Sequence, residues 1–534
     1  MTARVTTESL PEFTAWLNSG KRILGLAWAG ADLAIGEATD DSWTVRTTDS
    51  DLVRSVLDAI AASGQRPWCE LAGSVAIRIA RKWSLRVQDL SWLRDATTAL
   101  YTLRPNMVSP QARTLRQAEG SNTLGFKADS AADAATKTAM LVTELQATAG
   151  VAGKAATDAV RWEQMWRPRQ MKGWRVDMSV LEDELAAARA TADEFTKTLG
   201  IDLASARSDS RKAEVLAQLA EMGIALSSLS HDAIDAVVVA DLPERAKLAW
   251  QPFRDAYSAS WRLSKILEIK RAAERGGGRV YSTLMIRGAR TGRASSSRIA
   301  LQNIPRNLRH LLVADEGNVL VALDLSNAEP RVAAALSGDE SLLADIYSPD
   351  GVYASLARKI WGESAFKDGV VIKAYRELAK NVFLQTMYGA QDETLASKLG
   401  VSLSEARQRR EQLWAAYPKL AAYQARLLTD LRAGRVMRYT NGRPMPTPKG
   451  RHAMLNAAVQ GQAADVFYQK MEAVLSKLQV ESAFLPIHDE LVVEVPARFA
   501  DLAQSVLVQE MSSEFLGVQM TGDSAILGRS WKKV

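Results

Sequence analysis

The chain has 534 residues, of which 47% are hydrophobic and 24% are charged, enough apolar material for several domains. Its single cysteine, Cys69, excludes a disulfide framework and any zinc site built from several cysteines. Basic residues number 67 and acidic residues 61, a formal charge of +6, and residues 161–534 hold the whole excess. A basic excess in one part of a chain indicates a polyanionic partner, although a randomly solvated surface explains it equally well.

No segment of the sequence suits a membrane span or an export signal. The first residues, MTARVTTESLPEF, contain no apolar run like that of a secretory signal peptide. No run of about 18 uncharged apolar residues, the length that a spanning helix needs, occurs anywhere. We therefore expect no membrane partner and a cytoplasmic location.

Residues 1–160 combine short apolar runs with helical patterns, which predicts a small α/β domain. Three strands are predicted, at 23–30, 31–38 and 43–48, the first two forming a hairpin. The segment 51–64 has apolar residues at helical spacing and ends in glycine, with Asp51 placed to cap its first turn. The small and polar segment 121–138 predicts a loop before another helix.

Residues 155–275 are predicted to be almost entirely helical. Two long helices are expected, one over 178–200 that ends at Gly200 and one over 253–278 that ends in three glycines. The second is rich in basic residues. Such helices suit an arm that contacts a nucleic-acid backbone, and a plain helical bundle is the simpler alternative.

Strands return after residue 278. The alternating segment 279–288 predicts an edge strand, and the apolar run 318–326 predicts a buried strand that ends near Asp324. Helices fill 341–434, and 483–496 is predicted to be a hairpin of two apolar strands around a His-Asp-Glu tip.

Five residues of this C-terminal half need a joint explanation. Asp324 and Asp489 each lie beside a run of hydrophobic residues, where a carboxylate is costly unless it binds a cation or a hydrogen-bond donor. Two such carboxylates repel each other, and two divalent metal ions about 3.5–4 Å apart relieve the repulsion. Arg376, Lys380 and Tyr388 follow at helical spacing and offer positive charge to a polyphosphate. Together these groups suit phosphoryl transfer, although each alone has a commoner structural role.

These residues lie in segments that resemble the motifs of the family A DNA polymerases, the DNA polymerase I type. The three polymerase motifs are matched by LVALDLSNAEPRVAAALSGD (320–339), RELAKNVFLQTMYGA (376–390) and PIHDELVVEVP (486–496). Two further segments of the family are matched by TGRASSSRIALQNIPR (291–306) and NAAVQGQAADVF (456–467). Five motifs in the family's order make the resemblance specific.

The resemblance implies an α/β multidomain fold, in which a right-hand polymerase of palm, fingers and thumb follows an RNase H-like α/β domain of the exonuclease type. The implied divisions are a degenerate 3′–5′ exonuclease-like domain at 1–160, a helical thumb and connection at 161–290, the first part of the palm at 291–345, the fingers at 346–434 and the second part of the palm at 435–534. The implied activity is that of a DNA-directed DNA polymerase, which adds dNTPs to a primer 3′-OH.

The same resemblance assigns roles around the reacting phosphate. Asp324, Asp489 and the main-chain carbonyl of Leu325 are expected to hold two Mg²⁺ ions, for which Mn²⁺ can substitute. Arg376 and Lys380 are expected to grip the incoming triphosphate, and Lys380 also to give a proton to the departing pyrophosphate.

Further positions of the family surround this centre. Glu490 is expected to support the metal-binding carboxylates from behind. Tyr388 is expected to stack near the templating base, and Glu329 to fill the space that a ribose 2′-OH needs. Leu384 stands where the family has an aromatic residue against the incoming sugar, which puts sugar discrimination in question. The expected duplex contacts, for each of which a loop-stabilising hydrogen bond is the alternative, are Arg293, Gln302, Asn303, Asn456, Gln460 and His488.

The N-terminal domain lacks the acids with which a 3′–5′ exonuclease of this family holds two metals. No Asp-x-Glu occurs in residues 1–170, and Ser74 or Val75 stands where a further Asp is expected. Asp158 matches the last acid, but Lys154 replaces the tyrosine before it, and Asp95 matches another acidic position. We therefore expect a structural remnant without proofreading activity.

Two rival functions remain open. A single-subunit RNA polymerase shares the paired carboxylates and a basic helix, although Glu329 and the His-Asp-Glu tip argue against it. A catalytically inactive DNA-binding scaffold is the other, and the joint presence of Asp324, Asp489, Arg376 and Lys380 argues against that. We expect a monomer that binds primer-template DNA and dNTPs in a bacterial or phage-infected cytoplasm, with accessory replication or repair proteins.

Overall fold

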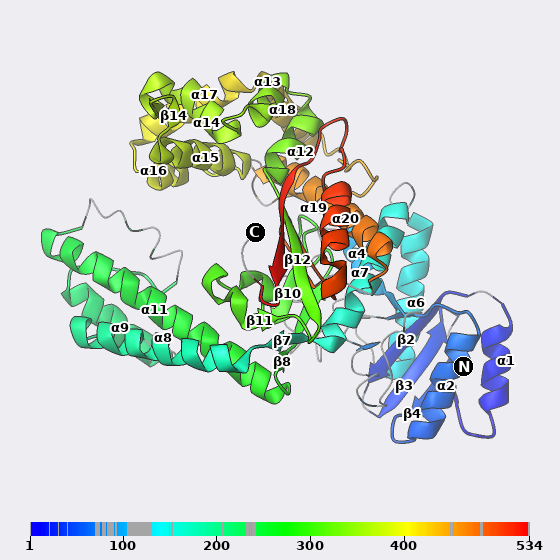
Figure 1. Ribbon diagram of the computed structural model, residues 1–534. Coiled ribbons are helices and arrows are strands. Elements are labelled where there is room, and N and C mark those ends of the chain that lie inside the picture. The colour runs from blue at the N-terminus through cyan, green and yellow to red at the C-terminus, as the bar shows by residue number, and fades with distance from the viewer. Residues whose placement is uncertain are drawn as a thin grey trace.

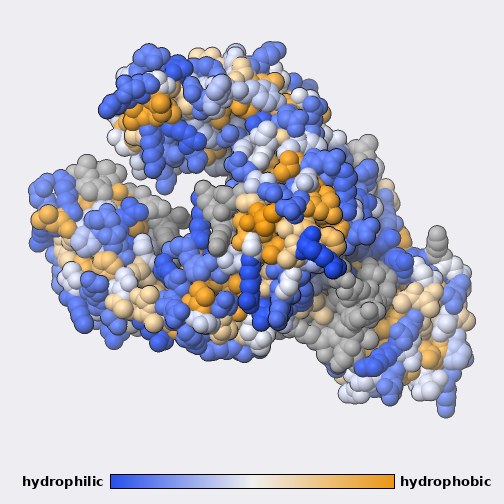
Figure 2. Space-filling model, in the orientation of Figure 1, coloured by the Kyte–Doolittle hydropathy of each residue, from blue (hydrophilic) through white to orange (hydrophobic). Residues whose placement is uncertain are grey.

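The computed structural model has four parts: an N-terminal α/β unit, a long helical arm, a central sheet and a second group of helices (Figure 1). The surface is hollowed between the arm and the second group, which lie on either side of the central sheet (Figure 2). The structure describes residues 2–69 except 21, 30 and 40, and residues 75, 76, 79, 82, 90, 93–103, 130–148, 150, 153–203, 208–230, 234, 237, 242–448, 450, 453–480 and 484–531.

The N-terminal unit is built on a six-stranded sheet in the order β1-β4-β3-β2-β5-β6. Its strands are β1 (Thr2–Arg4), β2 (Leu24–Ala29), β3 (Asp32–Glu37), β4 (Ser42–Arg46), β5 (Trp68–Cys69) and β6 (Arg94–Asp95). Among these strands β3 alone runs antiparallel to the others. The order β4-β3-β2-β5-β6 with this direction is that of an RNase H-like sheet. The three strands predicted in this region are confirmed.

Five helices accompany this sheet in the described residues: α1 (Leu10–Asn18), α2 (Ser50–Ala62), α4 (Ala96–Leu103), α6 (Ala131–Thr148) and α7 (Gly153–Lys172). The predicted cap of α2 is wrong by two residues. Asp49 is the N-cap and accepts a hydrogen bond from the Leu52 amide at 3.0 Å, while Asp51 lies inside the first turn. There a carboxylate is still favoured by the helix dipole.

Helix α6 begins at Ala131, so the predicted loop over 121–138 is wrong for its last residues; residues 121–129 lie outside the described residues. Alanine has the highest helix propensity, and it outweighs the small, polar composition here. The helix packs very closely on β2. A Cβ atom built on Gly25 would lie 1.8 Å from the carbonyl oxygen of Ala135. A small alanine core, with Ala27 of β2 packed against it, fills this contact.

The helical arm consists of α8 (Met178–Leu199), α9 (Asp209–Glu221) and α11 (Glu244–Arg275). α8 ends as predicted at Gly200, whose φ of +67° closes the helix. α11 begins nine residues before the predicted start and has Pro252 in its interior. Ion pairs from Arg262 and Lys270 join α11 to α8. The arm is therefore a helix pair, closed at its outer end by α9.

Short strands join the arm to the rest of the molecule. β7 (Trp174–Val176) interrupts the region that was predicted to be helical, and it pairs with β8 (Arg279–Val280) and β11 (Leu312–Val313). The single strand predicted over 279–288 is thus wrong in one respect. It is divided into β8 and β9 (Ser282–Met285), and β9 pairs with β10 (Ser295–Arg298) in another sheet.

The central sheet has the order β15-β16-β12-β17. Its strands, all antiparallel to their neighbours, are β15 (Leu485–Ile487), β16 (Glu490–Pro496), β12 (Asn318–Leu325) and β17 (Gly522–Gly528). Val321 and Leu323 of β12 belong to the largest hydrophobic core, and Leu320 and Ala322 to a second core. β12 is therefore buried on both faces, which explains its continuous apolar sequence, and the predicted buried strand and hairpin are confirmed.

Helices cover the rest. α12 (Ala328–Ser337) follows β12 directly, and α19 (Met454–Leu478) and α20 (Ala500–Met511) pack beside the sheet. The second helix group contains α13 (Glu340–Tyr347), α14 (Val352–Trp361), α15 (Lys373–Met387), α16 (Asp392–Leu399), α17 (Leu403–Ala416) and α18 (Pro418–Arg432), with the small hairpin of β13 (Phe366–Lys367) and β14 (Val370–Val371). No helix in the described residues is long and apolar enough to pass through a bilayer.

Candidate active site

Two carboxylates meet where β12 ends. Asp324 is the penultimate residue of β12, and Asp489 lies in the turn between β15 and β16. The Leu325 amide donates a hydrogen bond to the main-chain oxygen of Asp489 at 3.1 Å, which fixes the turn beside the strand end. His488 holds the turn with a φ of +55°. The structure thus brings together the two acids that the sequence separates by 165 positions.

The electrostatics of this pair show repulsion. Burial, and then the negative charge of Asp324, raise the pKa of Asp489 to about 7. A divalent cation between the two carboxylates would relieve this cost, and carboxylate and carbonyl oxygens are the ligands that Mg²⁺ prefers. Asp324, Asp489 and the Leu325 carbonyl therefore fit magnesium. Within the described residues no group of three or more Asp, Glu, His or Cys side chains is arranged to hold a metal.

The Glu490 side chain, next in sequence to Asp489, is bonded to Arg309 and Trp531. Its carboxylate accepts a hydrogen bond from Arg309 at 2.8 Å and one from the Trp531 indole at 3.5 Å. The Arg309 guanidinium lies 4.4 Å from the Trp531 ring centroid. Burial raises the pKa of Glu490, partly offset by the positive charge of Arg309. Glu490 thus fixes the start of β16 behind the acids. Arg309 and Trp531 were missed by the sequence analysis, because no local motif marks contacts 181 and 41 residues away.

Helix α15 presents the predicted basic face. Arg376, Lys380 and Leu384 lie four residues apart along it, and Tyr388 caps its C-terminal end. Lys380 and Leu384 are half-buried, whereas Arg376 is exposed and pairs with Glu377 at 3.2 Å. These side chains therefore form a stripe along the helix, and the stripe is exposed to solvent at the N-terminal end.

Tyr353 of α14 links this helix to the carboxylates, although the sequence analysis did not single it out. The Arg376 guanidinium lies 5.8 Å from its ring centroid. Burial raises the pKa of Tyr353, and the charges of Glu329 and Asp489 raise it further, whereas Arg376 lowers it. Tyr353 is therefore close to groups from both sides of the site. No motif around it signals this position.

Glu329, in the first turn of α12, is held by residues from two other segments. Arg293 forms an ion pair with its carboxylate. Burial, and then the charge of Glu329, raise the pKa of Tyr388 to about 12, and the Tyr388 hydroxyl lies beside Glu329 and Gln460. Four of the predicted residues, from four segments, are thus in one network.

Of the remaining predicted DNA contacts, Gln302 and His488 line a pocket together with Arg293. Gln302 donates to the Pro486 carbonyl at 3.2 Å, and Asn303 ends a short 3-10 helix. Within the described residues the Asn456 side-chain oxygen is buried without a hydrogen-bond partner. Burial, and then the charges of Arg293 and Arg309, lower the pKa of His488. A cavity of about 30 Å³ is lined by, among others, Arg293, Glu329, His488 and Asp489.

A buried ionic cluster lies behind Arg293. Asp465 of α19 is paired with Arg287 and, at 3.2 Å, with Arg443, and none of the three side chains is appreciably exposed. Gly292, with a φ of +92°, lies against both guanidiniums. The cluster thus anchors to α19 the loop that carries Arg293.

The acids of the N-terminal unit are engaged by protein groups. Asp158 pairs with Lys154 at 2.7 Å and with Arg161 at 3.0 Å. Asp95 is buried and accepts a hydrogen bond from the Thr98 amide at 2.8 Å, at the start of α4. Val75 is in a described helical turn, and Ser74 lies outside the described residues.

Comparison with known proteins identifies the family. Residues 245–533, more than half of the chain, match the family model described as DNA polymerase family A. The chain is similar to DNA polymerase I of Chloroflexus aurantiacus (32% identity over 45% of this chain and 27% of that protein), to the thermostable DNA polymerase I of Thermus thermophilus (34%, over 43% and 30%) and to the DNA polymerase of Mycobacterium phage D29 (29%, over 46% and 40%). The matched segment thus spans well under half the length of these relatives.

A solved structure has a similar fold over almost the whole chain. It is described as the POL domain of Pol1 from M. smegmatis in complex with DNA primer-template and dNTP, and it matches with a TM-score of 0.79 at 20% identity, over 99% of each chain. The predicted α/β multidomain, right-hand polymerase fold is therefore confirmed. With the family model covering the arm's last helix, the central sheet and the second helix group, the chain belongs to DNA polymerase family A.

Proposed function

We propose that this chain is a DNA-directed DNA polymerase that extends a primer on a template by two-metal phosphoryl transfer and has no working proofreading activity. The observation that carries the proposal is the meeting of Asp324 and Asp489 beside the network that includes Tyr388 of α15. Family membership supports the same reaction class.

In this mechanism Asp324, Asp489 and the Leu325 carbonyl would hold two Mg²⁺ ions, or Mn²⁺ in their place. Bound metals lower the pKa of the primer hydroxyl and neutralise charge on the departing pyrophosphate. The half-buried Lys380 and the exposed Arg376 bind the triphosphate, and the Lys380 ammonium gives a proton to the pyrophosphate. Glu490, fixed by Arg309, keeps the turn of Asp489 in place.

Sugar and template selection fall to the network around Glu329. The Glu329 side chain, held by Arg293, fills the space beside the sugar C2′ atom of the incoming dNTP. Leu384 contributes apolar contact without the flat ring of an aromatic residue, and Tyr388 stacks near the templating base. Duplex contacts near the primer end are made by Arg293, Gln302, Asn303, Asn456, Gln460 and His488.

We assign the parts of the polymerase to the predicted domains: 1–160 exonuclease-like, 161–290 thumb and connection, 291–345 and 435–534 palm, and 346–434 fingers. The boundary near residue 160 falls inside α7, so that this helix belongs to both neighbours. The protein acts as a monomer on DNA in the cytoplasm of a bacterium or of a phage-infected cell, where replication or repair proteins can assist it.

The absence of proofreading rests on the N-terminal contacts. The carboxylate of Asp158 already binds two cationic side chains, and Asp95 caps a helix. β2 offers Gly25, Ala27 and Ala29 on alternating positions, and α6 packs directly on it. Such a surface gives neither ligands for two metals nor room for a primer end.

Primer extension tests the polymerase assignment. Asp324→Asn and Asp489→Asn each keep the side-chain shape and remove a charged ligand, so we expect a loss of at least about 10²–10³ in rate with Mg²⁺. Asp501→Asn, an exposed acid on α20, serves as the matched control and should extend normally. Near-normal extension by either site variant would overturn the assignment. Preferred use of ribonucleotides would instead indicate an RNA polymerase, and wild type that binds DNA without extending it would indicate a scaffold.

A labelled primer with a 3′ mismatch tests the missing proofreading. Incubated with Mg²⁺ or Mn²⁺ and no nucleotides, it should keep its length. Shortening of the primer that is abolished by Asp158→Ala and retained in Asp489→Asn would show an active exonuclease and contradict this part of the proposal.

A further inference from the structure

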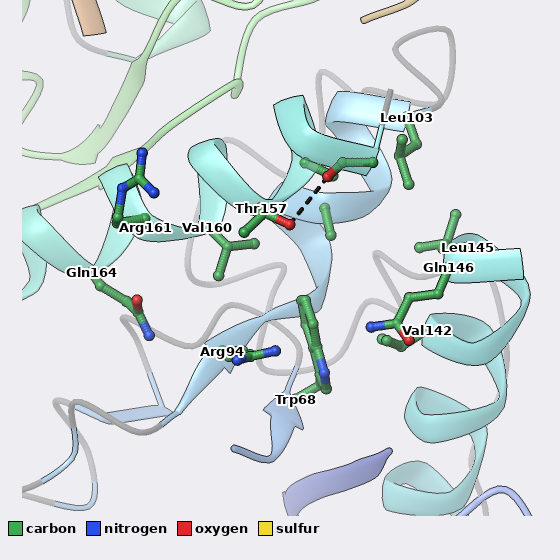
Figure 3. Close-up of a pocket in the computed structure, with 13 residues that line it drawn as sticks. Trp68, Arg94, Leu103, Val142, Leu145, Gln146, Thr157, Val160, Arg161 and Gln164 are labelled. Carbon is green, nitrogen blue, oxygen red and sulfur yellow. Dashed lines mark hydrogen bonds between the residues drawn. The ribbon is translucent and has the colours of Figure 1, made fainter. Parts of the chain in front are cut away.

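The N-terminal unit contains a cavity that no step of the proposed polymerase reaction uses. It encloses about 260 Å³ between α4, α6, α7 and the ends of β5 and β6 (Figure 3). None of the described residues that line it belongs to the network around Asp324 and Asp489. The cavity is therefore a separate feature of the molecule.

Most of the lining is apolar. The aliphatic walls come from α4, α6 and α7 and are formed by Ala99, Leu103, Val142, Leu145, Ala156 and Val160. The indole ring of Trp68, at the end of β5, stands among them and leaves one side toward the cavity (Figure 3). Apolar walls with a flat aromatic surface are typical of sites that bind ring systems.

Several polar groups at the edge are already bonded within the protein. Thr157, Gln164 and Arg161 each donate to a protein oxygen at distances between 2.6 and 3.1 Å. The guanidinium of Arg161 also points away from Trp68 (Figure 3). These three side chains therefore do not supply the polarity of the cavity.

Arg94 supplies it. Its guanidinium lies 5.4 Å from the Trp68 ring centroid, and in the part of the chain that the structure describes no carboxylate pairs with it. Burial, and then the positive charge of Arg66, lower the pKa of Arg94, and a bound anion would offset both costs. From the other side, the Gln146 side chain extends toward Trp68 (Figure 3). A half-buried cation of this kind attracts an anion.

We infer that this cavity binds a small planar aromatic anion, whose ring lies against Trp68 and whose anionic group bonds to Arg94, with the Gln146 amide as a further hydrogen-bond partner. The volume admits one compact ring system rather than a length of nucleic acid. Two sources share this chemistry, an aromatic carboxylic acid and a free nucleoside monophosphate.

Calorimetric titration of the full chain tests the inference with four probes: 2-naphthoate, its neutral amide, dAMP and deoxyadenosine. At least one anion should bind saturably with one site per chain, and about tenfold or more tightly than its neutral analogue, as expected for a charge-assisted hydrogen bond. Binding by naphthoate alone identifies the carboxylic acid as the source, and binding by dAMP alone identifies the nucleotide.

Three variants locate the site. Arg94→Gln should weaken binding of the anion about tenfold. Arg66→Gln, which removes a neighbouring charge outside the lining, should leave binding nearly unchanged. Ala156→Leu keeps every charge and fills the cavity, so it should abolish binding. All three should extend primers like wild type, which reports that they fold. The inference is overturned if neither anion binds saturably at millimolar concentration, or if both Arg94→Gln and Ala156→Leu leave binding unchanged.

Discussion

The Glu329 carboxylate is fixed by side chains from distant segments. Arg293 pairs with it, and Tyr388, whose pKa is raised to about 12 by burial and then by the charge of Glu329, lies on another side of it. A carboxylate restrained from two sides cannot swing away to admit a 2′-hydroxyl without breaking both contacts. In the proposed mechanism, the position of the Glu329 side chain, rather than its size alone, would exclude a ribose.

Replacing Glu329 by Ala removes this obstacle. We expect the preference for dNTP over rNTP to fall by about tenfold or more, because a space opens where the 2′-hydroxyl would lie. Leu384→Ala should change the preference little, since Leu384 offers only apolar contact. Single-nucleotide incorporation with matched dNTP and rNTP measures both variants. An unchanged preference in Glu329→Ala rejects Glu329 as the residue that selects the sugar.

The polymerase motifs predicted Asp324, Asp489 and Glu329 because each motif is a continuous stretch of chain. Arg309 and Tyr353 escaped prediction for the opposite reason. Each acts through a partner more than a hundred residues away or on another helix, and nothing local distinguishes such an arginine or tyrosine from a surface one.

At the scale of elements, the loop before β10 depends on one glycine. Gly292 has a φ of +92°, and a Cβ atom there would lie 2.9 Å from nitrogen atoms of both Arg287 and Arg443. Those guanidiniums pair with the buried Asp465 and cannot move without exposing its charge. The loop therefore holds Arg293 by close packing as well as by its backbone conformation.

We expect Gly292→Ala to destabilise the protein and to weaken primer-template binding, because both strain and collision displace Arg293. Gly317→Ala is the matched control, since Gly317 has a φ of +77° with open space around its Cβ direction. Strain alone should cost about 1–3 kcal/mol in either variant. Thermal unfolding and DNA titration compare them, and equal losses would show that the collision is unimportant.

Lys470 joins α19 to the end of α20 and makes this link sensitive to pH. Its ammonium donates to the main-chain oxygen of Ser513 at 2.6 Å, and burial lowers its pKa to about 8. Between about pH 8 and 10.5 the unfolded chain therefore holds a proton that the folded chain has lost, so this residue's contribution to stability rises with pH across that window.

We take the melting temperature of wild type minus that of Lys470→Met. This difference should accordingly increase by about 2 °C or more between about pH 7.5 and 9.5. Differential scanning calorimetry at the two pH values measures the difference, in which all groups common to both proteins cancel. A constant difference would mean that Lys470 titrates normally in the folded protein.

Element types were predicted well where a pattern is long, as in α8 and the 483–496 hairpin, and poorly where tertiary pairing decides. β7 has three residues and exists because β8 and β11 flank it, so no sequence window could separate it from the helices around it. The start of α6 was missed because its alanines were taken for loop residues.

At the scale of the whole molecule, α7 fastens the N-terminal unit to the central part. Glu472 of α19 accepts hydrogen bonds from Arg161 at 2.9 Å and from the Trp162 indole at 2.7 Å. Trp162 is fully buried in the largest core, beside Tyr468. The N-terminal unit and the central part thus share one helix and one core.

Glu472→Ala should lower the melting temperature by a few degrees, because it leaves a buried indole N–H unpaired and removes one of the two carboxylates that pair with Arg161. The rate of primer extension at saturating substrate should stay unchanged, since the residue is absent from the site around Asp324. Glu514→Ala, at an exposed glutamate elsewhere in the chain, is the control. A fall in extension rate with an unchanged melting temperature would contradict the fastening role.

If the N-terminal unit has no proofreading activity, as we propose, the packing of α6 on β2 bears on whether simple mutation could restore it. An acid at Ala27 would place a charge against the alanine contact, and any side chain at Gly25 would meet the Ala135 carbonyl. Under that proposal, a descendant of this sequence that regained an exonuclease would first have to displace a helix. Its accuracy would otherwise depend on the polymerase site or on a separate protein.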